Sequence, residues 1–155
     1  MAGVRESRRL RTFSRLLFII YMAVTLYMLL LSESFGRKVK EEYRYNLQPF
    51  NEIKRFYHLL GTDNNEKAIL NLVGNIICFL PFGLYQASEL DNKKHTVIKV
   101  TFLTMLFSLS VELVQLYFKI GIFDVDDLIL NTLGGMSGGI LYCLYRSLCG
   151  STTTQ

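Results

Sequence analysis

The sequence has little charge. Asp, Glu, Lys and Arg make up 19% of its 155 residues, whereas soluble domains usually carry about 25%. Half of the residues are hydrophobic, and the mean hydropathy is +0.27. This composition argues against a soluble domain and indicates a membrane protein with almost no soluble part.

Cysteine is scarce as well, with three residues at positions 78, 143 and 149. None lies in a CxxC pair or is spaced with a histidine as zinc ligands are. An odd number of cysteines in or beside apolar segments predicts neither a disulfide framework nor a metal site. We therefore expect no metal and no cofactor, and we interpret the cysteines as small, polarisable core residues.

The apolar residues fall into four blocks, which we expect to cross a membrane as helices. The blocks cover residues 16–32, 68–88, 97–118 and 128–145. A spanning helix needs about 20 apolar residues, within a range of roughly 17–25. The second and third blocks fit easily, and the other two are at the short end. The sequence thus predicts an all-α integral membrane bundle of four transmembrane helices.

The predicted organisation is a basic arm at 1–15, a membrane domain at 16–149 and a polar tail at 150–155. The arm and the first apolar block could instead form a signal peptide. However, no small-x-small cleavage site follows, and the apolar run is longer than a typical signal core. We therefore expect an uncleaved first span.

The basic residues predict the orientation of the chain. Five arginines precede the first span and lysines follow the second, whereas the loop before the fourth span is mostly acidic. Because cytoplasmic flanks are enriched in Lys and Arg, we expect a plasma-membrane protein with both termini in the cytoplasm. The basic residues of the first loop, at 37, 38, 40 and 44, oppose this orientation. Since topology accounts for the net charge of +4, no nucleic-acid partner is expected.

The long first loop contains a second helical pattern. Phe50, Ile53 and Leu60 recur at helical spacing, Asn51 can cap the segment and Gly61 can end it. We expect a short amphipathic helix lying at the outer membrane interface, because its apolar face has little else to bury against. The alternative is an ordinary surface helix in an exposed loop.

Polar residues interrupt the last three spans at similar depths. They are Asn71 and Asn75 in the second span, Glu112 and Gln115 in the third, and Asp127 and Asn131 in the fourth. With alternating spans and a rise of 1.5 Å per residue, all six come within about 12 Å of the outer surface. A charge at mid-bilayer costs about 2.5–3.5 kcal/mol, so such residues serve either a function or hydrogen bonds between helices. We expect them to form a polar pocket that opens outward and is roofed by residues 46–60.

Small and kink-forming residues are expected where helices meet. They are Pro81, Gly83, Gly134, Gly135, Gly138 and Gly139. Two overlapping small-xxx-small patterns in the fourth span let another helix approach closely, within the bundle or in a dimer. We favour internal packing, because the same side of this helix carries Asp127 and Asn131. Just before it, Asp124 or Asp126 is placed to cap the helix.

Several motifs together resemble the VanZ-like family of small bacterial membrane proteins, over most of residues 46–139. Asn46-Leu47 with Pro49-Phe50 resembles its NLxPF element, and the segment from Asn75 to Gly83 resembles N-I-x-x-F-x-P-F-G. Glu112 and Gln115 match E-x-x-Q, and the segment from Asp127 to Gly138 matches D-hydrophobic-x-x-N-x-x-G-x-x-x-G. The chain departs from many relatives at Gly121-Ile122-Phe123, where they have an arginine. The resemblance implies a protein of the bacterial cell envelope, in a family named for lowered susceptibility to the glycopeptide teicoplanin.

Three functions are compatible with these residues. In the first, which we favour, the pocket binds an amphiphile without catalysis, and the partners are membrane lipids, a lipid-linked envelope precursor or a lipoglycopeptide. In the second, a membrane enzyme acts on a lipid-linked substrate with Glu112 and Asp127 as acid and base, although no nucleophile motif is present. The third is proton-coupled transport through Glu112, which four spans without inverted halves make less favourable.

Overall fold

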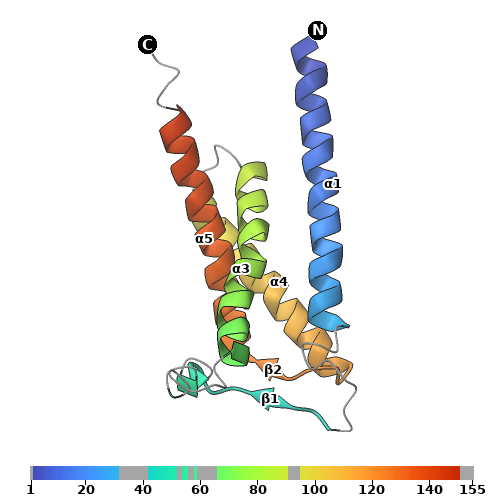
Figure 1. Cartoon of the computed structure of the whole chain (residues 1–155), viewed down its shortest axis with the longest axis vertical. Helices are drawn as coiled ribbons and strands as arrows, with labels where there is room; N and C mark the ends of the chain where they lie inside the picture. Colours follow the sequence, from blue (N-terminus) through green and yellow to red (C-terminus); the bar gives the residue numbers. More distant parts are fainter. Residues whose placement is uncertain are drawn as a thin grey trace.

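The described part of the chain forms four long helices and two very short strands. The computed structural model describes residues 2–31, 42–51, 54, 55, 58, 66–90 and 95–150, without the side chains of 2–8, 66–71 and 150. Its elements are α1 (Ala2–Leu30), β1 (Tyr45–Asn46), α3 (Glu66–Glu89), α4 (Thr96–Tyr117), β2 (Phe123–Asp124) and α5 (Val125–Gly150). Both termini lie at one end of the molecule, and β1 and β2 lie at the other (Figure 1). We call these the terminal end and the strand end.

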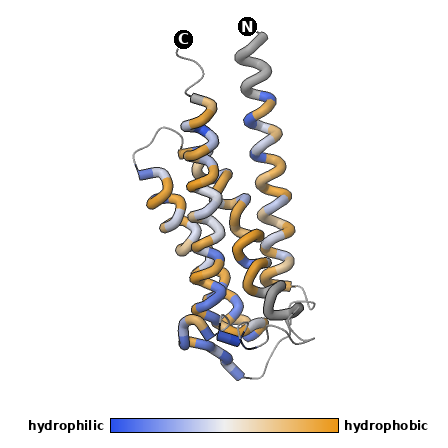
Figure 2. The backbone as a smooth tube through the Cα atoms, turned by 60° about the vertical axis from the view of Figure 1, so that its left-hand side comes forward, coloured by the Kyte–Doolittle hydropathy of each residue, from blue (hydrophilic) through white to orange (hydrophobic). Residues whose placement is uncertain are grey.

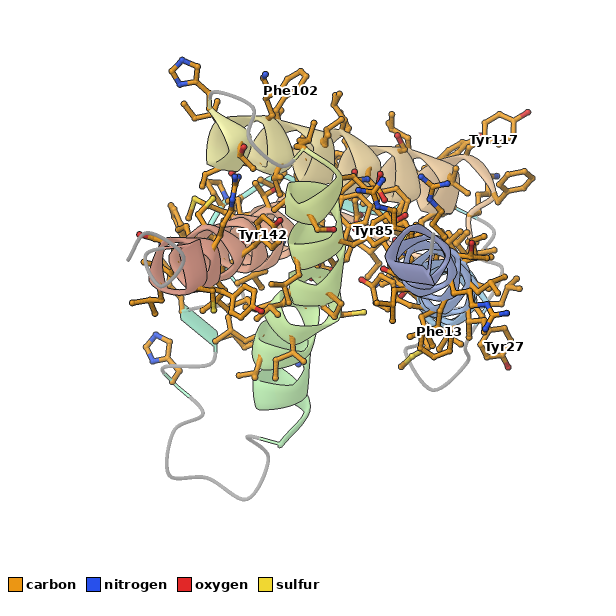
Figure 3. The ribbon with its side chains drawn as sticks, turned by 90° about the horizontal axis from the view of Figure 1, so that it is seen from above. Phe13, Tyr27, Tyr85, Phe102, Tyr117 and Tyr142 are labelled. Carbon is orange, nitrogen blue, oxygen red and sulfur yellow. The ribbon has the colours of Figure 1, made fainter. Side chains whose placement is uncertain are left out.

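Among the described residues, three helices are long and apolar enough to cross a membrane. They are Arg9–Leu30 within α1, Thr96–Tyr117 and Val125–Cys149, whereas α3 is not among them. Large apolar side chains such as Phe102 and Tyr117 on α4 are exposed and point away from the bundle (Figure 3). This apolar exterior is that of a membrane protein, as predicted, and three of the four expected spans meet the criteria by length and hydropathy.

The helices differ from the predicted blocks mainly at their ends. The arm predicted at 1–15 continues directly into the first span, since α1 begins at Ala2. No proline interrupts this segment, and its arginines and leucines favour helix. At the other end of the chain, α5 begins three residues before the predicted 128 and continues beyond the predicted 145, to Gly150. The expected tail at 151–155 lies outside the described residues.

Contacts between α3 and α5 are the most extensive in the bundle, followed by those between α4 and α5. Backbone atoms meet directly there, because a Cβ at Gly83 would overlap the carbonyl of Gly135. A Cβ at Gly134 or Gly138 would likewise overlap the carbonyls of Ile76 and Leu80 on α3. Gly135 faces Thr104 on α4, and Gly139 faces Val100 on the same helix. These glycines therefore lie inside the bundle.

Pro81 does not lie at this interface, contrary to the expectation that it packs between helices. It is exposed on α3, and the helix continues through it. The reason is its position on the helix, since the neighbouring Leu80 and Gly83 are the residues that face α5.

The first helix is attached to the others by fewer contacts. The ring of Phe18 stacks on Tyr85 of α3 with 3.7 Å between centroids, and the Tyr21 hydroxyl donates to the carbonyl of Cys78 at 2.5 Å. Near the terminal end, Arg15 and Glu89 form an ion pair at 3.9 Å, with both side chains substantially exposed. Helix α1 is therefore held mainly by side chains, and at its carboxyl end Leu29 packs in a buried hydrophobic cluster with Phe79 of α3 and Val111 of α4.

A short parallel β pair closes the strand end, and the sequence pattern did not indicate it. Tyr45 pairs with Phe123 and Asn46 with Asp124. Two-residue strands are too short to show the alternation by which strands are recognised. The pair becomes possible because the chain turns two residues after α4, at Lys119, where φ is 55° and the amides of Lys119 and Ile120 donate to the carbonyls of Leu116 and Gln115.

The amphipathic helix expected near 51–60 falls largely outside the described residues. Asn51, Lys54, Arg55 and His58 are helical and exposed, and the Lys54 amide donates to the carbonyl of Phe50 at 3.0 Å. The predicted apolar positions 53 and 60 and the terminating Gly61 lie outside the described residues. The apolar face of this helix therefore stays a prediction.

Candidate functional site

Polar side chains from three helices gather toward the strand end, where many residues are hydrophilic (Figure 2); four of these side chains are buried, and those of Asn75 and Asp127 are half-buried. We call this group the polar cluster. Its members are Asn75 on α3, Ser108, Glu112 and Gln115 on α4, and Asp127 and Asn131 on α5. Of the predicted site residues, the Asn71 side chain lies outside the described residues.

The α4 members form one buried column, as their spacing of four and three residues predicts. Ser108, Glu112 and Gln115 are 0%, 2% and 0% exposed. Polar groups buried at this level are unfavourable unless they are hydrogen-bonded. Their partners therefore decide what this column does.

Gln115 joins α4 to α1. Its Nε2 donates to the carbonyl of Leu29 at 2.8 Å. Leu29 lies in the last turn of α1, where carbonyls have no partner within the helix. The bond thus caps the carboxyl end of α1, whereas Gln115 Oε1 has no hydrogen-bond partner in the structure.

Asn131 joins α5 to α4 one turn deeper. Its Nδ2 donates to Ser108 Oγ at 2.9 Å, and Asn131 is 2% exposed. Its Oδ1, like Gln115 Oε1, has no hydrogen-bond partner. The pocket hypothesis requires Glu112 and Asn131 on the same side of the bundle. They face a common region, because Asn131 is bonded to Ser108, which lies one turn from Glu112 on the same face of α4.

The two carboxylates of the cluster bind different groups. Asp127 Oδ1 accepts a hydrogen bond from Asn75 Nδ2 at 2.6 Å, which links α5 to α3. Glu112 Oε2 accepts a bond from the Asp124 amide at 2.9 Å, which links α4 to β2. The structure therefore places Asn75 with Asp127 and Asn131 with Ser108, and it connects Glu112 to the strand pair.

Two further aspartates hold the strand segment onto α5. Asp124 Oδ1 accepts from the Asp126 amide at 2.9 Å, which is an N-cap of α5, and both Asp124 oxygens lie 3.3 Å from Asn46 Nδ2. Asp126 Oδ1 accepts from the Phe50 amide at 2.5 Å, and Phe50 itself has a φ of 65°. Burial raises the pKa of the Asp124 carboxyl above its ordinary value, against the lowering effect of its hydrogen bonds to Asp126 and Asn46.

Sequence reasoning explained one of the three aspartates by capping, and Asp124 is that cap. It missed Asn46 as the partner of Asp124 and Phe50 as the partner of Asp126. It also placed Ser108 on the correct face without assigning it a partner. The signal that could have indicated these partners was the Asn46–Phe50 motif. The Asn46 side chain binds Asp124, 78 residues later, and the Phe50 amide binds Asp126, 76 residues later.

The arrangement is rich in acceptors. Among the described residues, no group of three or more His, Cys, Asp or Glu side chains is placed to hold a metal ion. Within the described part of the chain, Gln115 Oε1 and Asn131 Oδ1 have no hydrogen-bond partner, and Glu112 lies on the same face of α4 as Gln115. Chemically, the cluster is suited to accept hydrogen bonds from a donor group.

Comparison with known proteins gives two matches. A family model described as VanZ/LLP1 matches residues 18–146. Protein VanZ of Enterococcus faecium is 32% identical over 100 residues, which cover 57% of this chain and 61% of that protein. The chain thus aligns with less than two thirds of the length of this curated relative. No solved structure matches the chain.

Proposed function

The chain belongs to the VanZ/LLP1 family of membrane proteins, and on this premise we propose that it binds an amphiphile at the outer face of the bacterial plasma membrane. Binding at the polar cluster would reduce the action of a glycopeptide antibiotic of the teicoplanin type, as the family resemblance implies. The ligand would be a lipid headgroup, a lipid-linked envelope precursor or the lipoglycopeptide itself. Catalysis is not part of the proposal.

The proposed topology has four spans with both termini in the cytoplasm. Its support is that both termini lie at one end, where Arg9, Arg11 and Arg15 of α1 are exposed (Figure 1). In this topology α3 also crosses the membrane, as the second span along the chain, since its 24 residues extend about 36 Å at 1.5 Å per residue. The strand end then faces outward, where an envelope ligand arrives.

The observation that carries the proposal is the gathering of amides and carboxylates from three helices at that outward end, with Glu112, Gln115 and Asn131 buried. The Asn75–Asp127 and Asn131–Ser108 bonds cross between helices, and the Asn46–Phe50 segment is bonded to the loop beside them. Helix packing alone does not require these polar contacts, because the glycines already join α5 to α3 and α4. A binding site at the membrane surface would require polar groups at this end.

Two isosteric substitutions test the proposal. Glu112→Gln and Asp127→Asn each remove a charge but keep an oxygen that can accept the bond from Asp124 or Asn75. We expect both variants to accumulate in the membrane like the wild type and to lose the reduced susceptibility to teicoplanin in a bacterial host. Glu89→Gln is the matched control, because it makes the same change in the exposed ion pair near the terminal end. Full protection by both variants would contradict the proposed site.

A further inference from the structure

Two deeply buried amide oxygens have no hydrogen-bond partner among the residues that the structure describes. Gln115 and Asn131 are 0% and 2% exposed, and each amide nitrogen is already bonded within the protein. The remaining atoms, Gln115 Oε1 and Asn131 Oδ1, can only accept. A buried acceptor without a donor is unfavourable, so these two oxygens indicate that a donor group belongs beside them.

Both oxygens lie along the buried column of α4, because Gln115 is part of the column and Asn131 of α5 contacts it. Asn131 is bonded to Ser108, and Ser108 and Gln115 are separated by two turns, or about 10 Å along the helix. Glu112 lies between them on the same face, itself 2% exposed. A group beside Glu112 is therefore within about one turn of either acceptor, 5.4 Å along the axis.

These three acceptors define the chemistry of the complementary ligand. Amide and carboxylate oxygens attract N–H and O–H donors, and the carboxylate favours a donor that is positively charged. A phosphate has the opposite character, and a quaternary ammonium has the charge without an N–H. We propose that the polar cluster binds the N–H-bearing ammonium group of an amphiphile beside Glu112, with the oxygens of Gln115 and Asn131 as acceptors.

The proposal rests on the proposed amphiphile-binding function and specifies its ligand class. The apolar part of the ligand would lie in the membrane around α4, whose opposite face exposes Leu113, Val114 and Tyr117 on the same two turns. The ammonium group has two possible sources with the same chemistry. One is an aminophospholipid of the membrane, and the other is an amine-bearing amphiphile that arrives from outside.

A pair of ligands isolates the N–H groups. Dodecylammonium and dodecyltrimethylammonium have the same chain and charge, but the second has no N–H donor. Titrated into the purified full-length protein at neutral pH, dodecylammonium should bind at least about tenfold more tightly, since a charge-assisted hydrogen bond contributes one decade of affinity or more. Equal affinities would overturn this inference and leave amphiphile binding intact. Binding of neither compound would contradict the proposed function as well.

The source of the ammonium group is tested in nanodiscs. If a membrane lipid supplies it, discs of phosphatidylethanolamine should stabilise the protein more than discs of phosphatidylcholine, and should reduce the affinity for dodecylammonium. If it comes from outside, the two discs should behave alike and the preference for dodecylammonium should persist. Both results support the ammonium site, whereas loss of the preference in both discs would overturn it.

A matched pair of variants locates the site. Glu112→Gln should reduce the preference for dodecylammonium by about tenfold, because the charge beside the N–H groups is removed. Glu89→Gln should leave the preference unchanged. Full preference in Glu112→Gln would place the amine elsewhere and overturn the assignment. The wild-type comparison of the two ligands does not depend on the folding of either variant.

Discussion

The two halves of α5 are held in the bundle by different means. One half, around Gly134 to Gly139, contacts α3 and α4 through backbone and small side chains, with no room for a Cβ at several positions. The other half, toward the strand end, is held by side-chain bonds from Asp124, Asp127 and Asn131. The glycine half requires a close approach of backbones, and the positions without room for a Cβ accept only glycine. The half at the strand end requires particular partners and leaves two acceptors without one among the described residues, which is why we assign function there.

The largest effect is expected in the glycine half. Gly83→Ala places a methyl group against the Gly135 carbonyl, whereas the same change at Gly74 meets nothing within 4 Å. Overpacking of this kind costs about 1–3 kcal/mol, and an alanine in open space favours the helix by up to about 1 kcal/mol. Thermal unfolding of the purified protein should therefore rank Gly83→Ala well below Gly74→Ala. Equal stability would show that the close α3–α5 contact does not hold the bundle.

A smaller effect is expected where α1 meets the polar cluster. Gln115→Leu removes the bond to the Leu29 carbonyl and should cost about 1 kcal/mol, the usual net value of a hydrogen bond. Hydrogen exchange should rise in the last turn of α1 and change little at the α3–α5 contact. Ser110→Ala is the control, because Ser110 is exposed on α4 and bonds only within its own helix. Unchanged exchange in α1 would contradict the anchoring role of Gln115.

The smallest effect is expected at Asp124 and depends on pH. Since burial raises its pKa above the ordinary value of 3.8, the fold favours the neutral carboxyl, and this contribution is lost as the pH rises through the folded-state pKa. Asp124→Asn keeps a good N-cap and does not ionise. The variant should therefore gain stability relative to the wild type as the pH rises from about 4 to 7, measured by thermal unfolding at each pH. A relative loss over this range would show that the ionised form is favoured instead.

The helices and the buried polar face could be predicted from the sequence for simple reasons. Long apolar blocks leave little choice but helices, and the four-and-three spacing of Ser108, Glu112 and Gln115 places them on one face in any helix. What could not be predicted was which polar groups meet. The pairing of Asn46 with Asp124 depends on how the chain turns at Lys119 after α4 and on a two-residue strand, and neither has a local pattern. Similarly, Gln115 caps α1 only because of how α4 and α1 are placed against each other.

The capping of α1 by Gln115 also has a consequence for the order of biosynthesis. The two residues are 86 positions apart, and those joined by the Asn46–Asp124 contact are 78 apart. During synthesis from the N-terminus, α1 enters the membrane long before the residue that caps it exists. The strand end of the molecule is therefore completed only when the last two helices have been inserted, and a nascent chain stopped before residue 115 has a first helix with an open end.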